Sequence, residues 1–260
     1  MNKSTNITVN FVVAGTQKGG TTALYSYLNE HDNIVMASTK EVHFFDNESY
    51  FNNDIDYSIY HSFFKEKNDG ELCQKLYGEA TPIYMYWNEV PKRIYNYNKY
   101  MKFIIILRNP IDRAHSHWNM ERERNNDTTS FSDAIYNEKN RCKEALPLQH
   151  RIFSYLDRGF YTKQIKQIWK YFPKEQTLIL KSEDLKNNPS KVLSEVSKFL
   201  KINNFSNMGV RNVHTRDYIS KMTQKEHDYL SSIFANEVRE LEELLDWDCS
   251  DWLKYNKGGE

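Results

Sequence analysis

The chain has 260 residues, of which 39% are hydrophobic and 27% charged, with 35 basic and 35 acidic side chains. This length fits a single α/β domain with a substantial core, so we expect one domain over residues 1–260. A formal net charge of zero argues against general nucleic-acid binding, which rests on a basic surface, although a local basic pocket remains compatible with it.

The cysteines and the apolar runs indicate the compartment. Cys73, Cys142 and Cys249 are far apart and show neither CxxC nor Cys/His ligand spacing, so we expect free thiols rather than a zinc site or a disulfide framework. The apolar run at residues 11–14 is too short for a signal peptide or a membrane span. We therefore expect a cytoplasmic protein without a membrane span.

Apolar runs rich in β-branched residues alternate with helical patterns along the chain. Strands are predicted at residues 10–14, 34–36, 76–79, 103–107 and 177–180. Helices are predicted at residues 21–29, 90–97, 110–124, 161–171 and 189–200, and a buried stripe from Leu230 to Leu245 predicts a last helix. Continuous apolar strands suit a sheet covered on both faces. The alternation predicts a three-layer α/β sandwich around a central, mainly five-stranded parallel sheet, with ligands beyond the carboxyl ends of the strands.

A glycine-rich loop, GTQKGGTT at residues 15–22, follows the first predicted strand and precedes a helix. The spacing from Gly15 to Gly20 is that of a loop whose backbone N–H groups hold phosphate oxygens, aided by the positive end of the next helix. The alternative is a simple glycine-rich turn. The anion-binding candidates are Thr16, Gln17, Lys18, Gly19, Gly20, Thr21 and Thr22.

The lysine of this loop is misplaced for a kinase. A nucleotide triphosphatase carries Lys and Ser/Thr directly after the second glycine, where this chain has Thr21 and Thr22. Lys18 lies inside the loop instead. This arrangement argues against Mg·ATP chemistry and favours a group held directly by the lysine.

A second candidate anion site follows the fourth predicted strand, at Arg108-Asn109-Pro110. Asn109 can cap the next helix and Pro110 suits its first turn. A kinase-like enzyme often ends a neighbouring strand in a magnesium-binding acid, and here Arg108 stands in that place. Together with Ser116, further along that helix, Arg108 can hold a second phosphate; alone, Ser116 would be interpreted as an ordinary helical serine.

Three segments carry a family resemblance: GTQKGGTTAL at residues 15–24, KEVHFFD at 40–46 and LRNPIDRAHSHW at 107–118. Weaker matches lie at residues 78–85, 158–173 and 183–200. In this order, and over most of the chain, they resemble the sulfotransferases that use 3′-phosphoadenosine 5′-phosphosulfate (PAPS). The likeness is closest to the branch with the heparan-sulfate N- and 3-O-sulfotransferases and their bacterial relatives.

The resemblance implies a role for each motif. The loop would be a P-loop-like phosphosulfate-binding loop, with Lys18 on the bridging oxygen and the sulfuryl group. Arg108 and Ser116 would hold the 3′-phosphate that distinguishes PAPS from ATP. Glu41 would be the general base on the acceptor, with His43 beside it; from the sequence alone, Glu41 could equally begin a helix or lie in a surface loop, and His43 could be a packed histidine.

Two positions depart from the heparan-sulfate enzymes. The segment matching their EKTP run reads Glu79-Ala80-Thr81-Pro82, so it lacks the lysine. The late basic loop over the 3′-phosphate is indistinct, and Arg216 is the candidate for it. Both departures bear on the acceptor more than on PAPS.

These features predict an enzyme that moves a sulfuryl group from PAPS to a hydroxyl or amine of a small-molecule or saccharide acceptor, as in natural-product or carbohydrate sulfation. The other product is adenosine 3′,5′-bisphosphate (PAP), and no metal is required. One alternative is a P-loop kinase or other nucleotide phosphotransferase, which would depend on magnesium. Another is a non-catalytic nucleotide- or sulfate-binding module, against which the pairing of Lys18 with Glu41 argues.

Overall fold

The computed structural model describes residues 7–52, 54–65, 75–205 and 218–255. The chain divides into two compact units, one made of Met1–Leu107 and Gln167–Val213, the other of Arg108–Lys166 and His214–Glu260. The prediction of a single domain stays a prediction. None of the helices in the described ranges is both long and apolar enough to cross a membrane.

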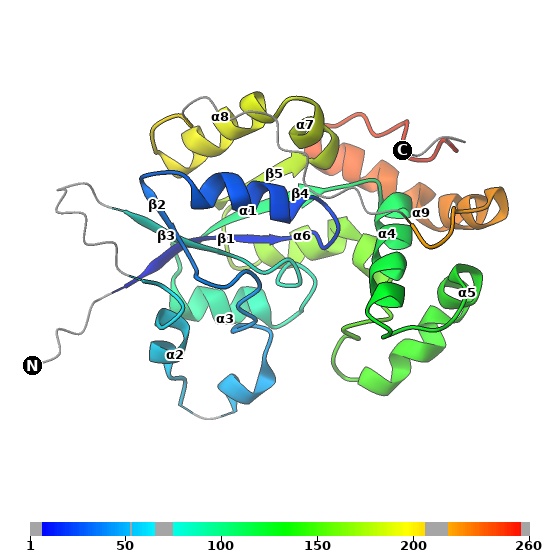
Figure 1. Ribbon diagram of the computed structural model, residues 1–260, viewed down its shortest axis with the longest axis horizontal. Coiled ribbons are helices and arrows are strands. Elements are labelled where there is room, and N and C mark those ends of the chain that lie inside the picture. The colour runs from blue at the N-terminus through cyan, green and yellow to red at the C-terminus, as the bar shows by residue number, and fades with distance from the viewer. Residues whose placement is uncertain (1–6, 53, 66–74, 206–217, 256–260) are drawn as a thin grey trace, which may run out of the picture. The chain divides into compact units, whose positions relative to one another are not determined.

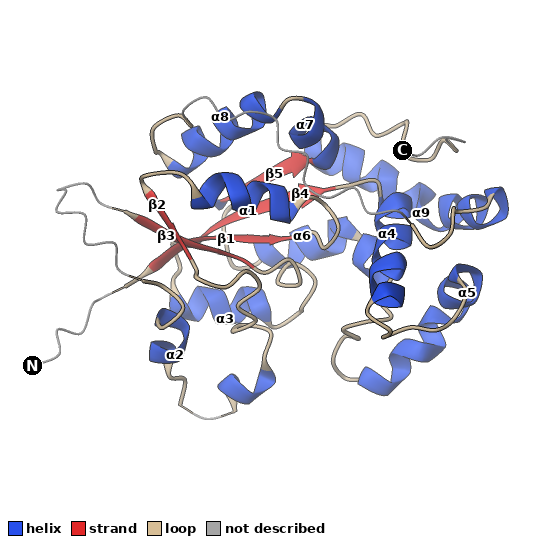
Figure 2. Ribbon diagram, in the orientation of Figure 1, coloured by secondary structure: helices blue, strands red, loops and turns tan. Residues whose placement is uncertain are grey.

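A five-stranded, all-parallel sheet forms the centre of the first unit (Figure 2). Its strands are β1 (Val9–Gly15), β2 (Ile34–Met36), β3 (Leu76–Ala80), β4 (Lys102–Leu107) and β5 (Thr177–Lys181), in the order β2-β3-β1-β4-β5. β1 lies in the middle, where Val12 is in register with Glu79 of β3 and Phe103 of β4. The predicted sheet is confirmed, and each predicted strand matches to within one residue at either end.

Helices cover both faces of this sheet (Figure 1). The first unit contains α1 (Thr21–Asn29), α2 (Tyr57–His61), α3 (Val90–Tyr97), α7 (Ser182–Asn187), α8 (Pro189–Leu200) and the short 3-10 helices η1 (Glu48–Phe51) and η4 (Lys174–Gln176). The helix α6 (Tyr161–Trp169) begins in the second unit and ends in the first. The three-layer prediction is therefore confirmed.

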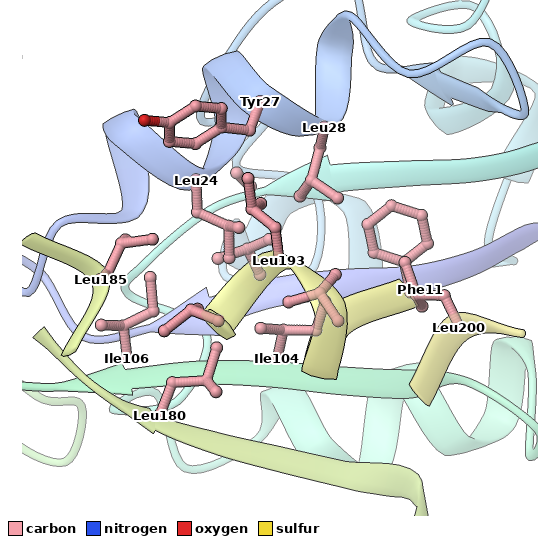
Figure 3. Packing of buried hydrophobic residues seen from close by; sticks show 14 of the residues in the cluster. Phe11, Leu24, Tyr27, Leu28, Ile104, Ile106, Leu180, Leu185, Leu193 and Leu200 are labelled. Atoms are coloured by element: carbon pink, nitrogen blue, oxygen red, sulfur yellow. The ribbon is translucent and has the colours of Figure 1, made fainter. Parts of the chain in front are cut away.

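The main core lies between the sheet and the helices α1, α7 and α8 (Figure 3). Side chains of the strands meet those of the helices there, and all are buried: Phe11, Val13, Ile104, Ile106 and Leu180 from the sheet, and Leu24, Leu28, Leu185, Val192, Leu193 and Val196 from the helices. Burying one such side chain stabilises a fold by about 1.5–3 kcal/mol. On the other face, the rings of Phe103 and Phe172 pack with centroids 4.7 Å apart.

The second unit contains α4 (Pro110–Glu123), α5 (Phe131–Arg141), η2 (Cys142–Ala145), η3 (Asp157–Gly159) and α9 (Gln224–Leu245). The helix α9 begins six residues before the predicted apolar stripe, because Thr223 and Glu226 form a capping box at its start. Asn109 caps α4 by accepting a hydrogen bond from the Ile111 N–H at 2.9 Å, as the sequence predicts.

Candidate active site

The loop after β1 is held closely against the sheet. The Thr16 N–H donates to the Ile106 carbonyl at 2.9 Å, and the Gly19 N–H donates to the Thr16 carbonyl at 2.9 Å. A Cβ at Gly19 would collide with the Ile106 carbonyl oxygen, so this position requires glycine. The loop backbone is thus fixed by its own hydrogen bonds and by the neighbouring strand.

The end of this loop forms the start of α1. Gly20 occupies the N-cap with φ 102°, in the left-handed region, and has no side chain to cap the helix. The first turn of α1 carries no acidic residue. Thr16 and Thr21 are buried, Gln17 and Lys18 are partly exposed, and Gly20 and Thr22 are exposed. This helix start suits an anion, which the helix dipole favours.

A second group of charged side chains lies in the segment after β2. The Lys40 Nζ is 2.7 Å from Glu41 Oε1, and His43 Nε2 is 3.6 Å from Glu41 Oε2. On its other side, His43 Nδ1 is 2.9 Å from Asp46 Oδ2. Asp46 is completely buried, whereas the His43 side chain is 44% exposed. His43 thus bridges a partly exposed carboxylate and a buried one, an arrangement that the sequence alone did not reveal.

These contacts shift both pKa values. Hydrogen bonds to Asp46 and Glu41 raise the pKa of His43 to about 9. Burial acts to raise the pKa of Glu41, but the hydrogen bond to His43 and the charge of Lys40 outweigh it and lower that pKa to about 2. At neutral pH the segment therefore holds an imidazolium between two carboxylates.

The raised pKa of His43 predicts a pH-dependent stability. Below the ordinary histidine pKa of 6.5 the imidazole is protonated in both the folded and unfolded chains, and the folded chain has the full benefit of its ion pairs. As the pH rises through about 9 the folded chain loses this proton and the benefit with it. The wild type should therefore exceed His43→Gln in free energy of unfolding at about pH 6, with the excess vanishing by about pH 10. Urea unfolding of both proteins at each pH checks this; an excess that does not change with pH would refute it.

The three candidate catalytic residues share a backbone feature. Lys18, Glu41 and His43 have φ values of 70°, 64° and 54°, in the left-handed region that non-glycine residues seldom adopt. Each such residue costs on the order of 1–3 kcal/mol and persists only where its surroundings hold it, commonly at functional sites. The sequence gives no signal of this geometry.

A buried carboxylate, Glu79, lies at the end of β3 and was noted in the sequence only as part of a motif match. Its side chain is completely buried and accepts hydrogen bonds from Tyr60 and Thr81. An acidic residue ending a buried strand next to the central strand is a signal that could have singled it out. Nothing in the sequence pattern identifies Tyr60 as its partner.

The second predicted anion site belongs to the second unit. Arg108 is partly exposed, with its guanidinium 3.5 Å from the Tyr218 hydroxyl, and Ser116 is buried on α4. Arg216 lies outside the described residues. The two histidines beside Ser116 have different neighbours: His115 contacts Phe131, and His117 contacts Tyr155. Over the described ranges, no cluster of three or more His, Cys, Asp and Glu side chains is placed to hold a metal ion.

Comparison with known proteins identifies the family. The sulfotransferase domain family matches residues 9–245. The chain belongs to this family. The chain thus carries a sulfotransferase domain, and the kinase interpretation is not supported.

Curated relatives of the chain include enzymes whose names give heparan sulfate as their substrate. Human heparan sulfate glucosamine 3-O-sulfotransferase 5 is 32% identical over 74% of this chain and 53% of its own length. The human bifunctional heparan sulfate N-deacetylase/N-sulfotransferase 3 is 33% identical over 73% of this chain and 22% of its own. The membrane-associated sulfotransferase kil1 of Dictyostelium discoideum is 28% identical over 92% and 65%. The chain thus spans about half the length of the 3-O-sulfotransferase that it matches.

Solved structures agree with the fold. A sulfotransferase from Alicyclobacillus acidocaldarius superposes with a TM-score of 0.79 at 26% identity, covering 95% of this chain and all of the other. A mouse sulfotransferase complexed with PAP has a TM-score of 0.58 at 16% identity, covering 92% and 88%, which shows a shared fold alone.

Proposed function

We propose that this sulfotransferase moves the sulfuryl group of PAPS to a hydroxyl or amine of a small-molecule or saccharide acceptor and releases PAP. The observation that carries the proposal is the loop after β1, which has Lys18 inside a glycine-rich turn and ends at a start of α1 that no side chain caps. The relatives that act on heparan sulfate support a saccharide acceptor.

The loop residues fit the phosphosulfate. Gly19 packs closely against Ile106, and Gly20 has a left-handed backbone. Neither residue carries a side chain that would keep an anion away from the loop backbone. The phosphosulfate would be held by the residues of this loop: Thr16, Gln17, Lys18, Gly19, Gly20, Thr21 and Thr22. Bound PAPS supplies the sulfuryl group and a nucleotide leaving group on which negative charge develops. Lys18 would offset that charge, and a charge that is in place before the reaction costs no reorganisation when the transition state forms.

Glu41 would take the proton of the acceptor. With a pKa of about 2 it is a weak base, because Lys40 and His43 stabilise its charged form. A weak base is sufficient if the proton moves late, since an alcohol oxygen becomes strongly acidic as its bond to sulfur forms. The protonated His43 keeps the carboxylate ionised and oriented until then. Its role is therefore to position Glu41.

The acceptor class follows from charge and from the relatives. The chain is neutral overall, and Ala80 stands where the heparan-sulfate pattern has lysine. Both features favour a small or weakly charged acceptor over a long polyanion. A saccharide or natural-product hydroxyl or amine meets these conditions.

Arg108 and Ser116 would hold the 3′-phosphate of the donor, together with Arg216. We therefore expect PAP to bind more tightly than AMP, and Arg108→Ala to reduce this preference. A hydrogen bond to a charged group contributes about 1.5–3 kcal/mol, so the loss should be about 10–100-fold in the ratio of dissociation constants. Isothermal titration calorimetry of both nucleotides with both proteins measures it.

Arg124→Ala is the matched control for this experiment. Arg124 also lies in the second unit, its side chain is 56% exposed, and it pairs with Glu121 at 3.6 Å. Its loss should leave the preference for PAP over AMP unchanged. Equal affinity of the wild type for the two nucleotides, or an unaltered preference in Arg108→Ala, would overturn the assignment of the 3′-phosphate.

A further inference from the structure

The buried carboxylate of Glu79 is the centre of a hydroxyl cluster in the first unit. The Tyr60 hydroxyl donates to Oε1 at 2.8 Å, and the Thr81 hydroxyl donates to Oε2 at 2.6 Å. The Tyr84 hydroxyl also hydrogen-bonds this carboxylate. Glu79, Tyr60, Thr81 and Tyr84 are all buried, with at most 1% of each side chain exposed. Solvent therefore does not reach these four side chains.

Tyr84 connects this cluster to the segment that carries Glu41 and His43. The backbone N–H groups of Phe44 and Phe45 donate to the Tyr84 hydroxyl oxygen at 3.1 and 3.3 Å. A phenol oxygen has two lone pairs and one proton. With both lone pairs used by the two N–H groups, the Tyr84 proton faces Glu79 and Thr81, which both hydrogen-bond this hydroxyl. The hydrogen bonds therefore run from the segment through Tyr84 to the buried carboxylate.

The same strand end fixes the segment at a second point. The Glu41 N–H donates to the carbonyl of Ala80, the residue after Glu79, at 2.9 Å. The residue after Tyr84, Met85, donates its N–H at 2.8 Å to the carbonyl of Ala14, immediately before the phosphate-binding loop. The end of β3 and the turn that follows it, up to Met85, are thus linked to the backbones of both candidate catalytic segments.

Such anchoring is required by the conformation of the segment. Glu41 and His43 both have positive φ, and each such residue costs on the order of 1–3 kcal/mol that the surrounding structure must offset. Their neighbours Val42, Phe44 and Asp46 are buried. A shift of the segment would therefore displace these buried side chains together with Glu41 and His43. The hydrogen bonds to Tyr84 and Ala80 oppose that shift.

We propose that Glu79 is a positioning residue which, through Tyr84, holds residues 41–46 in the conformation that presents Glu41 and His43 to the acceptor. This inference rests on the proposed function, because it assigns Glu79 to the reaction through the residues placed there. Nothing in it requires Glu79 to touch the donor or the acceptor.

The hydroxyl groups around this position favour a carboxyl group over an amide. The hydroxyls of Tyr60 and Thr81 donate to its two oxygens and the Tyr84 hydroxyl also hydrogen-bonds it, an arrangement that an ionised carboxylate accommodates. A glutamine offers one acceptor oxygen and an NH₂ group that itself needs acceptors. Burial raises the pKa of Glu79 to about 7, although its hydrogen bonds to Thr81, Tyr60 and Tyr84 favour the charged form. The nearby charge of Asp46 acts in the same direction as burial and raises this pKa.

The test compares Glu79→Gln, Tyr84→Phe and the double variant with the wild type. We expect each single variant to lower kcat by up to about 10²-fold, the cost of a small misplacement of catalytic groups, with the affinity for PAP unchanged. The double variant should be no worse than the more damaging single one, because both changes break the same connection. Tyr60→Phe is the matched control: it removes one hydroxyl from Glu79 but leaves Tyr84 in place, and should cost much less.

A second readout does not depend on turnover. NMR titration of the His43 ring should show its pKa falling from about 9 towards 6.5 in Glu79→Gln and Tyr84→Phe, since Asp46 and Glu41 are no longer held beside it. A merely structural role would lower the melting temperature and the affinity for PAP together and leave this pKa in place. If Glu79→Gln does not fold, the kcat and the His43 pKa of Tyr84→Phe decide whether the inference holds, because this variant removes a single oxygen atom.

A wild-type kcat and a wild-type His43 pKa in both single variants would overturn the inference, and so would fully additive losses in the double variant. Failure of the proposed function looks different. In that case the wild type transfers no sulfuryl group to any acceptor, while the His43 titration still reports whether Glu79 positions the segment.

Discussion

We expect Lys18→Ala to fold like the wild type and to lose about 10²–10³-fold in kcat, the usual cost of removing one preorganised group that stabilises transition-state charge. Lys18 lies within the loop between β1 and α1, with the left-handed backbone that directs its position. The hydrogen bonds that hold this loop run between backbone groups of Thr16, Gly19 and Ile106, so they do not need the lysine side chain. Steady-state kinetics with PAPS, together with the melting temperature, measure both parts of the expectation.

Lys18→Arg and Lys40→Ala are the controls. Arginine keeps the charge but presents a planar fork in place of a point charge, so it should restore only part of the rate. Lys40 pairs with Glu41 rather than lying in the loop after β1, so its loss should cost less than that of Lys18. Near-wild-type turnover in Lys18→Ala would show that the lysine is not part of the chemistry.

The second large effect is expected for Glu41→Gln. The amide is nearly isosteric with the carboxylate but cannot take the proton of the acceptor, so we expect kcat to fall by roughly 10²–10⁴-fold while PAP binding is retained. The loss should be smaller for a phenol than for an aliphatic alcohol, because the phenol releases its proton more readily. Parallel measurement of kcat on the two acceptors and of PAP affinity by calorimetry checks all three statements.

His43→Ala separates proton acceptance from positioning. His43 donates to Asp46 and lies 3.6 Å from Glu41, so its loss removes an orienting charge but leaves the carboxylate. We expect a weaker effect than in Glu41→Gln. If His43→Ala were inactive while Glu41→Gln turned over freely, the base would have to be assigned to the histidine.

The fold was largely predictable because its strands are buried on both faces. Continuous runs such as FIIIL at residues 103–107 leave a strand in a covered sheet as the simplest interpretation, and β4 confirms it. The helices α2, α5 and α7 were not predicted. The helix α5 has polar residues around much of its surface and buries only Phe131, Ala134, Ile135 and Glu138, so its apolar stripe is weak. The helices α2 and α7 have five and six residues, too few to show a period.

The site was predictable where a motif is continuous in sequence and not where contacts join distant segments. The loop from Gly15 to Thr22 and the cap at Asn109 are local, and the structure places both at helix starts. The contact of His43 with Asp46 also lies within one motif, but its strength depends on the burial of Asp46, which no local pattern reveals. The link from Glu79 to Tyr60 spans 19 residues and the link from Tyr84 to Phe44 spans 40, so only the folded sheet brings them together.

Transfer of a labelled sulfuryl group tests the proposed sulfotransferase activity most directly. The protein is incubated with PAPS carrying ³⁵S in its sulfuryl group and a panel of small alcohols, amines, phenols and saccharides, with EDTA present, and Lys18→Ala serves as the inactive control. We predict label in at least one acceptor, in equal amount to the PAP released, undiminished by EDTA and nearly absent with Lys18→Ala. Absence of labelled product from every acceptor, or magnesium-dependent phosphoryl transfer from ATP in its place, would contradict it.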